Sequence, residues 1–359
     1  LSTGGVQSFL INYAKHIDTD KVIFDYAVQT DEKQRYDDDV KKQGSHIYVT
    51  RPMTKFPIGY FKDIYNICKE NPDIQIVHSH LNYRNFLPLF AAKCAGVKIR
   101  ISHSHSAYVA SSIGKSVARK FYQMCLSFFS TDYWGCSEKA NIWLYGKKSK
   151  TAKNVHNAIS TKQYAYSEEQ RNIIREKLGI CNDDIAIIHV GTFSTPKNHI
   201  FLIQMFDEYH RRHRNAKLIL CGDGDKRNEI KWEIESRRLQ DAVLMLGMVD
   251  KVAVVLNAAD VFVLPSLYEG APLSVVEAQA NGLPCIVSGA VPNDVLFSNN
   301  CKKCDEFSLD KWCRAIDEMM NRRIVREQGT SQAQQAGFDI DIEAQKLEKM
   351  YFDCMENRK

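Results

Sequence analysis

Residues 261–284 of the chain read VFVLPSLYEGAPLSVVEAQANGLP, and this stretch decides the fold. The four apolar residues at 261–264 predict a short buried strand, and the loop after it ends at Pro272. Because proline suits the first position of a helix, we expect a helix to begin there. Asn281 and Gly282 supply its end signal. A strand that leads through a short loop into a helix is the repeating unit of parallel α/β sheets.

The backbone at the start of this predicted helix is suited to bind an anion. The first amides of a helix have no partner within it and lie at its positive end. This helix start follows the carboxyl end of a strand, which is where open α/β sheets bind ligands. A diphosphate fits such a position. The segment consists of Gly270, Ala271, Pro272, Leu273 and Ser274.

Two carboxylates flank these amides, Glu269 in the loop and Glu277 inside the helix. A carboxylate repels phosphate, but it accepts hydrogen bonds from the vicinal hydroxyls of a ribose or a hexose. Phosphate-binding amides between two such carboxylates predict a site for a nucleotide sugar. The structural alternative is that Glu269 caps the helix and Glu277 interacts with its dipole. The spacing alone does not decide between the two.

Short apolar runs alternate with amphipathic helical patterns along the whole chain, which predicts parallel sheets flanked by helices. The chain has 359 residues, more than the ~250–300 at which a single core stops growing. We therefore predict two domains, residues 1–160 with a returning helix at 338–359, and residues 161–337. The strand-like runs are residues 22–28, 46–50, 74–78, 97–103, 132–136 and 153–156, then 185–190, 217–221, 242–246, 261–264 and 284–288.

Composition excludes several classes of protein. Hydrophobic residues make up 44% and charged residues 25%, which is ordinary for a globular protein. Apolar runs stay below the ~18–20 residues that cross a bilayer. A net charge of +5 is too mild for a nucleic-acid domain, but it is compatible with a phosphorylated substrate or an anionic membrane surface.

The eleven cysteines form an odd, scattered set, which favours free thiols in a reducing cytoplasm. The one cluster is Cys301-x-x-Cys304, with Cys313 nine residues further on. A zinc site needs a fourth ligand and a second paired spacing, and neither is evident nearby. We expect these thiols to bind no metal.

The Glu269-x7-Glu277 spacing, in this loop and helix, resembles the retaining glycosyltransferases of family 4, which have the GT-B fold. The likeness covers essentially the whole chain and looks closest to bacterial enzymes of capsule, exopolysaccharide and O-antigen assembly. It implies an α/β protein of two facing Rossmann-like domains with parallel sheets and a C-terminal helix that returns to the first domain. The other matching segments are Thr3-Gly4-Gly5-Val6-Gln7, His103-Ser104-His105-Ser106, Ser137-Glu138, Trp143-Leu144-Tyr145-Gly146, His156-Asn157-Ala158-Ile159 and residues 190–198.

The resemblance implies three catalytic residues. His105 would contact the reacting sugar, Lys197 would neutralise the departing diphosphate, and Glu269 would hold the hydroxyls of the donor sugar. Glu277 would bind the ribose. The remaining donor-binding residues implied are Gly4, Gly5, Gly191, Thr192, Gly247 and Met248, with the last two contacting the base through their backbone.

Thr192 departs from the family pattern, which has an arginine directly after the glycine equivalent to Gly191. That arginine shares the role of Lys197, so half of the expected positive charge is missing. Lys226 or Arg227 are candidate substitutes. The departure motivates one alternative, a non-catalytic nucleotide-sugar-binding partner subunit. A nucleotide-sugar epimerase on a similar two-domain fold is another.

The resemblance implies a hexosyltransferase that needs no metal and no cofactor. It would move a sugar, with retained anomeric configuration, from a nucleotide diphosphate sugar to a glycan or polyprenyl-linked oligosaccharide acceptor. A UDP-sugar is the favoured donor. His78, His80, His103 and His105 suggest a metal site, but we expect structural roles for His78 and His103. Asp223-x-Asp225 lies in a glycine turn and predicts no metal either.

Residues 115–129 interleave basic and apolar side chains, as a helix on an anionic membrane surface does. The alternative is a buried face with a solvated edge. We therefore expect a cytoplasmic protein, peripheral on the inner face of the cell membrane, with no nucleic-acid partner. The glycine loop begins at Gly4, where a first strand should already have passed. We expect that strand to be missing from this chain.

Overall fold

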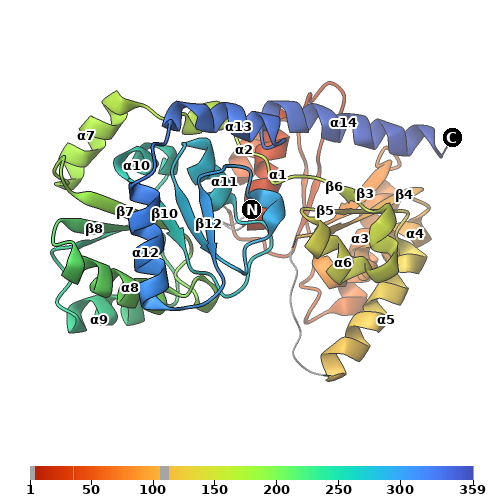
Figure 1. Ribbon diagram of the computed structural model, residues 1–359. Helices are drawn as coiled ribbons and strands as arrows, with labels where there is room; N and C mark the ends of the chain where they lie inside the picture. The colour runs from red at the N-terminus through yellow and green to blue at the C-terminus, as the bar shows by residue number, and fades with distance from the viewer. Residues whose placement is uncertain (1–4, 35, 106–112, 359) are drawn as a thin grey trace. The chain divides into compact units, whose positions relative to one another are not determined.

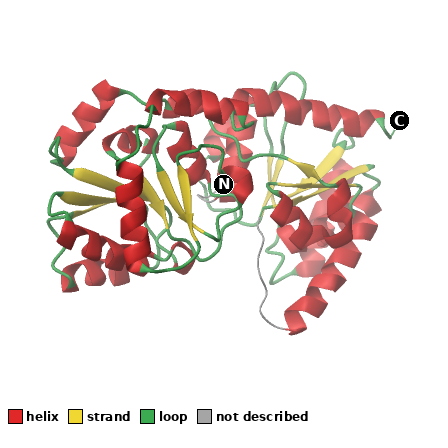
Figure 2. Ribbon diagram, in the orientation of Figure 1, coloured by secondary structure: helices red, strands yellow, loops and turns green. Residues whose placement is uncertain are grey.

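The computed structural model describes residues 5–34, 36–105 and 113–358, with the side chains of residues 113–119 outside the description. It divides into two compact units. Unit 1 comprises Leu1–Ala158 and Ile340–Lys359, and unit 2 comprises Ile159–Asp339. In both units, helices flank parallel strands (Figures 1 and 2).

Unit 2 contains one parallel sheet of six strands in the order β12-β11-β10-β7-β8-β9. Numbered along the chain, this is the 3-2-1-4-5-6 order of the Rossmann fold, and the direction of progression reverses between β7 and β10. Ligands of such sheets bind beyond the carboxyl ends of the strands at this switch point. The strands are β7 (Ile185–Val190), β8 (Ala216–Cys221), β9 (Val243–Gly247), β10 (Val261–Leu264), β11 (Cys285–Ser288) and β12 (Cys301–Cys304).

Both faces of this sheet are buried, so a central strand such as β10, Val-Phe-Val-Leu, is apolar on both sides. Successive side chains face opposite cores: Ile187 packs in one hydrophobic cluster, and Ala186 and Ile188 pack in the other. Helices lie on both sides of the strands (Figure 2). They are α7 (Glu168–Leu178), α8 (His199–Arg212), α9 (Arg227–Ser236), α10 (Val252–Ala258), α11 (Leu273–Ala280), α12 (Leu309–Met320) and α13 (Gly329–Gln335).

Unit 1 contains a parallel sheet in the order β3-β4-β5-β6 and a separate parallel pair, β1-β2. Its strands are β1 (Tyr26–Val28), β2 (Ile47–Val49), β3 (Ile76–Ser79), β4 (Ile99–Ser104), β5 (Asp132–Gly135) and β6 (Lys153–Asn154). Its helices are α1 (Gly5–His16), α2 (Asp37–Lys42), α3 (Pro57–Glu70), α4 (Phe86–Ala95), α5 (Ile113–Phe129), α6 (Glu138–Tyr145) and α14 (Ile340–Glu356).

The C-terminal helix α14 belongs to unit 1. It packs on α1, where Phe9 and Tyr13 share a buried cluster with Leu347 and Tyr351. The Glu348 carboxylate accepts a hydrogen bond of 2.7 Å from the backbone amide of Asp18.

The structure corrects several local expectations. Helix α11 begins at Leu273, with Pro272 as the residue before it. Gly5 of the glycine loop is the first residue of α1, and Gly4 lies outside the described residues. The strand at residues 22–28 is shortened to Tyr26–Val28.

The thiol cluster at Cys301 and Cys304 turns out to begin and end a strand, β12. We missed this strand because Cys-Lys-Lys-Cys has no β-branched residue. It lies at the edge of the sheet, where charged side chains are common. Both thiols are free, and Cys304 is buried.

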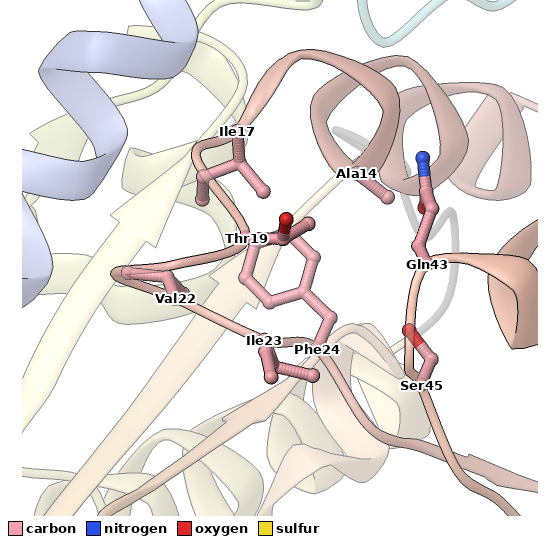
Figure 3. A pocket seen from close by; sticks show the side chains of 8 residues that line it. All are labelled: Ala14, Ile17, Thr19, Val22, Ile23, Phe24, Gln43 and Ser45. Atoms are coloured by element: carbon pink, nitrogen blue, oxygen red, sulfur yellow. The ribbon is translucent and has the colours of Figure 1, made fainter.

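Among the described residues, we find no helix with the length and apolar character that crossing a bilayer requires. Unit 1 contains a small cavity near the end of α1 (Figure 3). Its volume of about 10 Å³ leaves room for one water at most. The lining residues are Ala14, Ile17, Thr19, Val22, Ile23, Phe24, Gln43 and Ser45, none of which is a predicted site residue.

Candidate functional site

Two loops meet at the switch point of the unit 2 sheet, one after β7 and one after β10. The backbone amide of Leu267 donates a hydrogen bond of 2.7 Å to the carbonyl of Pro196, which joins them. Gly191 opens the first loop. A Cβ on Gly191 would lie 3.1 Å from Nε2 of His189 and 3.4 Å from Cδ of Lys197, which is tight enough to favour glycine.

The loop after β8 joins the same edge of the sheet. The amide of Phe193 donates to the carbonyl of Asp223 at 2.9 Å, and the amide of Lys226 donates to the carbonyl of Phe193 at 3.0 Å. Gly222 has φ +147°, and a Cβ there would lie 2.0 Å from the carbonyl oxygen of Gly191. The two loops therefore approach so closely that only glycine fits at position 222.

Lys197 and Glu269 come together at this edge, 72 residues apart in the chain. The Lys197 ammonium lies 2.6 Å from Oε1 of Glu269, and the two side chains are 19% and 9% exposed. The buried Ser266 hydroxyl donates to the same oxygen at 2.6 Å. The pair thus places a cation of the loop after β7 beside a carboxylate of the loop that leads into α11.

Glu277 lies in the second turn of α11 and is held by a residue that sequence reasoning missed. The Tyr164 hydroxyl donates a hydrogen bond of 2.9 Å to Oε1 of Glu277. Burial raises the pKa of Glu277 to about 6, and the hydrogen bond from Tyr164 opposes this rise. Tyr164 lies just after the predicted domain boundary at residue 160, and no local pattern marks it as a partner of Glu277.

Thr192 is exposed in the loop after β7. Of its two candidate substitutes, Lys226 pairs with Glu229 at 2.5 Å. Arg227 pairs with Asp223 at 3.2 Å, and its Nη1 lies 3.9 Å from the position of a Cβ on Gly247. A second cation therefore lies beside Gly247, at the end of β9. Met248, the next residue, is exposed.

Two buried histidines lie close to the β7 loop and were not singled out from the sequence. His189 Nδ1 lies 2.9 Å from the carbonyl oxygen of Val263, to which it must donate. His199 begins α8, and its ring meets that of His189 edge-on at 4.6 Å. Burial lowers the pKa of His199 to about 4, so both rings are neutral and fill the space beneath the loop.

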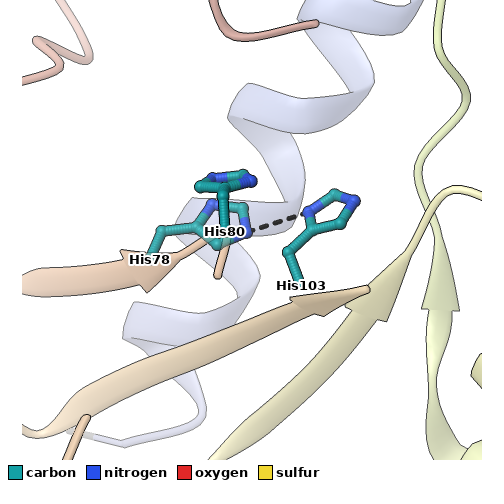
Figure 4. A group of neighbouring side chains, drawn as sticks. All are labelled: His78, His80 and His103. Atoms are coloured by element: carbon teal, nitrogen blue, oxygen red, sulfur yellow. Dashed lines mark hydrogen bonds between the residues drawn. The ribbon is translucent and has the colours of Figure 1, made fainter. Parts of the chain in front are cut away.

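Four histidines gather at the ends of β3 and β4 in unit 1. Figure 4 shows His78 and His103 directed toward each other, with His78 Nε2 3.0 Å from His103 Nδ1. His80 Nδ1 lies 2.7 Å from His105 Nε2. Tyr351 of α14 contacts His78 Nδ1 at 2.7 Å. The structure thus brings His105 into a stacked, hydrogen-bonded cluster.

Burial lowers the pKa of all four histidines, to about 3 for His78 and His105, so the cluster is neutral at pH 7. One nitrogen each from His78, His80 and His103 lie within 4.8 Å of one another, which is loose for a metal site. Tetrahedral zinc with Zn–N bonds of about 2.0–2.1 Å needs ligand nitrogens about 3.4 Å apart. In the structure, hydrogen bonds between ring nitrogens connect His78 with His103 and His80 with His105.

Comparison with known proteins identifies the family. Residues 170–336 match the family described as glycosyl transferases, group 1. The putative glycosyltransferase EpsF of Bacillus subtilis (strain 168) is 30% identical over 301 residues, which cover 82% of this chain and 78% of EpsF. The chain belongs to the group 1 glycosyl transferases.

One further relative and one solved structure resemble this group 1 glycosyl transferase. A UDP-Gal:alpha-D-GlcNAc-diphosphoundecaprenol alpha-1,3-galactosyltransferase of Escherichia coli is 25% identical over 318 residues, 82% of this chain and 79% of the relative. Anabaena HepE, solved in complex with UDP-glucose, superposes with a TM-score of 0.82 over 98% of this chain and 97% of HepE, at 16% identity. Solved structures of this kind confirm the predicted GT-B fold.

Membership in this family confirms the prediction of a glycosyltransferase, and it does not favour a binding-only subunit or an epimerase. The family match includes Gly191, Lys197, Glu269 and Glu277. The individual roles of these residues, and that of His105 in unit 1, stay predictions.

Proposed function

We propose that this group 1 glycosyl transferase moves a sugar from a UDP-sugar to a glycan or polyprenyl-linked acceptor, with retained anomeric configuration. The observation that carries the proposal is the Lys197–Glu269 contact beside the start of α11, at the switch point of the unit 2 sheet. The Escherichia coli relative, named for a UDP-Gal donor and a diphosphoundecaprenol-linked acceptor, supports the donor and acceptor classes. HepE, solved with UDP-glucose, supports the choice of UDP.

In this proposal, the donor diphosphate lies against the first amides of α11 and takes the Lys197 ammonium as its counter-charge. Glu269 then offers its carboxylate to the hydroxyls of the donor sugar, while Ser266 keeps one of its oxygens in place. Glu277 accepts hydrogen bonds from the ribose hydroxyls. Because Lys197 and Glu269 are already in contact, the donor's diphosphate and sugar arrive at adjacent partners.

The reaction breaks the bond between the anomeric carbon and the diphosphate oxygen, and the bonding electrons leave with the diphosphate. The acceptor hydroxyl attacks the same face of the sugar, and its proton passes to the leaving phosphate. Negative charge therefore develops on the diphosphate, where Lys197 and the helix amides stabilise it. We propose no metal, no cofactor and no protein nucleophile for this step. His105 remains a proposed contact of the reacting sugar.

We further propose a cytoplasmic protein that is peripheral on an anionic membrane surface. Three apolar side chains of α5, Phe121, Met124 and Phe128, are each more than half exposed. Their spacing of three and four residues places them on one face of the helix. Lys120 is exposed beside them. An exposed apolar stripe with a basic neighbour is suited to lie at a lipid headgroup layer. Lys115, Val117 and Arg119 belong to the same predicted pattern, but their side chains lie outside the description.

A thermal-shift screen against UDP-, GDP-, ADP- and TDP-sugars tests the donor class first. We expect UDP-sugars to raise the melting temperature most, because a ligand that binds only the folded state stabilises it. The product of the selected donor is then analysed by NMR for its anomeric configuration. Inversion of configuration, or a preference for another nucleotide, contradicts the proposal.

A further inference from the structure

The carboxylate of Glu277 is held from one side. Its Oε1 accepts a hydrogen bond of 2.9 Å from the Tyr164 hydroxyl. Among the described residues, Tyr164 is the one hydrogen-bond donor to this carboxylate. A carboxylate has about four acceptor positions on its two oxygens. Tyr164 occupies one of them, which leaves Oε2 for a ligand.

Tyr164 is itself tied to the helix that carries Glu277. Its backbone carbonyl accepts a hydrogen bond of 3.0 Å from the side chain of Asn281, the residue directly after α11. Its ring packs against the hydrophobic cluster on that face of the sheet. The hydroxyl therefore holds a position relative to α11 that does not depend on the ligand.

The Glu277 side chain has three rotatable bonds and would otherwise sample several rotamers. Ordering such a side chain when a ligand binds costs free energy, and a hydrogen bond made in advance reduces this cost. The pKa of Glu277 is raised by burial and is held down by the Tyr164 hydrogen bond, so this hydrogen bond also favours the charged acceptor form.

We propose that Tyr164 is a positioning residue, whose hydroxyl holds Oε1 of Glu277 so that Oε2 accepts the ribose hydroxyls of the donor. This inference rests on the ribose role of Glu277 in the proposed function. It adds a residue from the segment before α7, outside the loops at the carboxyl edge of the sheet. It also predicts that Tyr164 affects recognition of one chemical group of the donor, the ribose 2′-hydroxyl.

The test compares a nucleoside diphosphate with its 2′-deoxy analogue by calorimetry. The probe is UDP, GDP or ADP, whichever binds the unmodified protein most tightly. For that protein, loss of the 2′-hydroxyl should weaken binding about tenfold, the size expected for a hydrogen bond to a charged group. In Tyr164→Phe, we expect this ratio to fall to about two- to threefold, because a mobile carboxylate discriminates less. A ratio of dissociation constants does not depend on the fraction of protein that is folded.

Tyr166→Phe is the matched control. It removes a tyrosine hydroxyl that lies two residues further along the chain and does not contact Glu277. Tyr166 donates to the exposed Glu168, and its ring stacks under Arg326. We expect its ratio to equal that of the unmodified protein. Tyr164→Phe with an unchanged ratio overturns the inference.

Glu277→Ala separates the role of Tyr164 from the ribose role of Glu277. If its ratio falls to about one while that of Tyr164→Phe stays at tenfold, the ribose role of Glu277 holds and only the role of Tyr164 is wrong. If the ratio of Glu277→Ala also stays at tenfold, the ribose is bound elsewhere, and the proposed function of Glu277 fails together with the inference.

Discussion

Replacing Lys197 with methionine separates its structural and functional roles. Methionine preserves much of the aliphatic length and removes the charge that lies 2.6 Å from Glu269. Both side chains are less than a third exposed. Without the ammonium, the Glu269 carboxylate would keep only the Ser266 hydroxyl as a partner among the described residues. Breaking a fully buried pair costs about 3–5 kcal/mol, and exposed pairs contribute about 0–1 kcal/mol. For this partly buried pair, we expect a loss of about 2 kcal/mol.

Removing both charges should undo most of that loss. In Lys197→Met combined with Glu269→Gln, no unpaired charge remains, so we expect the free energy of unfolding to return to within about 1 kcal/mol of the unmodified value. Urea unfolding followed by circular dichroism measures the unmodified protein, Lys197→Met, Glu269→Gln and the double variant. The double-mutant cycle then gives the interaction between the two residues.

Activity should behave differently from stability. Loss of a group that stabilises charge in the transition state lowers kcat by about 10²–10³. We therefore expect UDP release in the presence of a polyprenyl-diphosphate-linked sugar to fall by this factor in Lys197→Met and to stay low in the double variant. A double variant that regains both stability and turnover refutes the reasoning, because Lys197 would then serve only to neutralise Glu269.

Three further outcomes are expected. Glu277→Gln should stabilise the protein by about 2 kcal/mol at pH 7, because ionising a carboxyl whose pKa burial raises to about 6 opposes folding. Urea unfolding should show this gain vanish as the pH falls from about 6 to below ~4.5. Gly222→Ala should lower the melting temperature, since its Cβ meets the Gly191 carbonyl oxygen at 2.0 Å; an unchanged melting curve contradicts this contact. Phe121→Ser with Phe128→Ser should reduce sedimentation with vesicles rich in phosphatidylglycerol, whereas Trp232→Ser, an exposed residue of unit 2, should not.

The elements of unit 2 were the most accessible from sequence. The strands at residues 185–190 and 261–264 were predicted with the bounds that the structure has, because each is a largely apolar run that ends at a glycine or a proline. The edge strand β12 was missed, since a strand with one neighbour need not be apolar.

In the site, too, only residues with a clear local sequence pattern could be predicted. Lys197, Glu269 and Glu277 follow or enter elements that the sequence marks clearly, so their placement at one edge of the sheet could be expected. Tyr164 could not be found this way, because its contact with Glu277 spans 113 residues and depends on how the segment before α7 packs on α11. The mutual hydrogen bonds of the histidine cluster likewise follow from the register of β3 and β4, which pairs His78 with Ile101.

The most direct test of the central claim is titration of the protein with UDP by calorimetry, using the unmodified protein, Lys197→Ala and Glu277→Ala. Our account predicts binding to one site and at least a tenfold weaker affinity in each variant, because one contacts the diphosphate and the other the ribose. Equal affinity for UDP in all three proteins would contradict the assignment of this edge of the unit 2 sheet as the donor site.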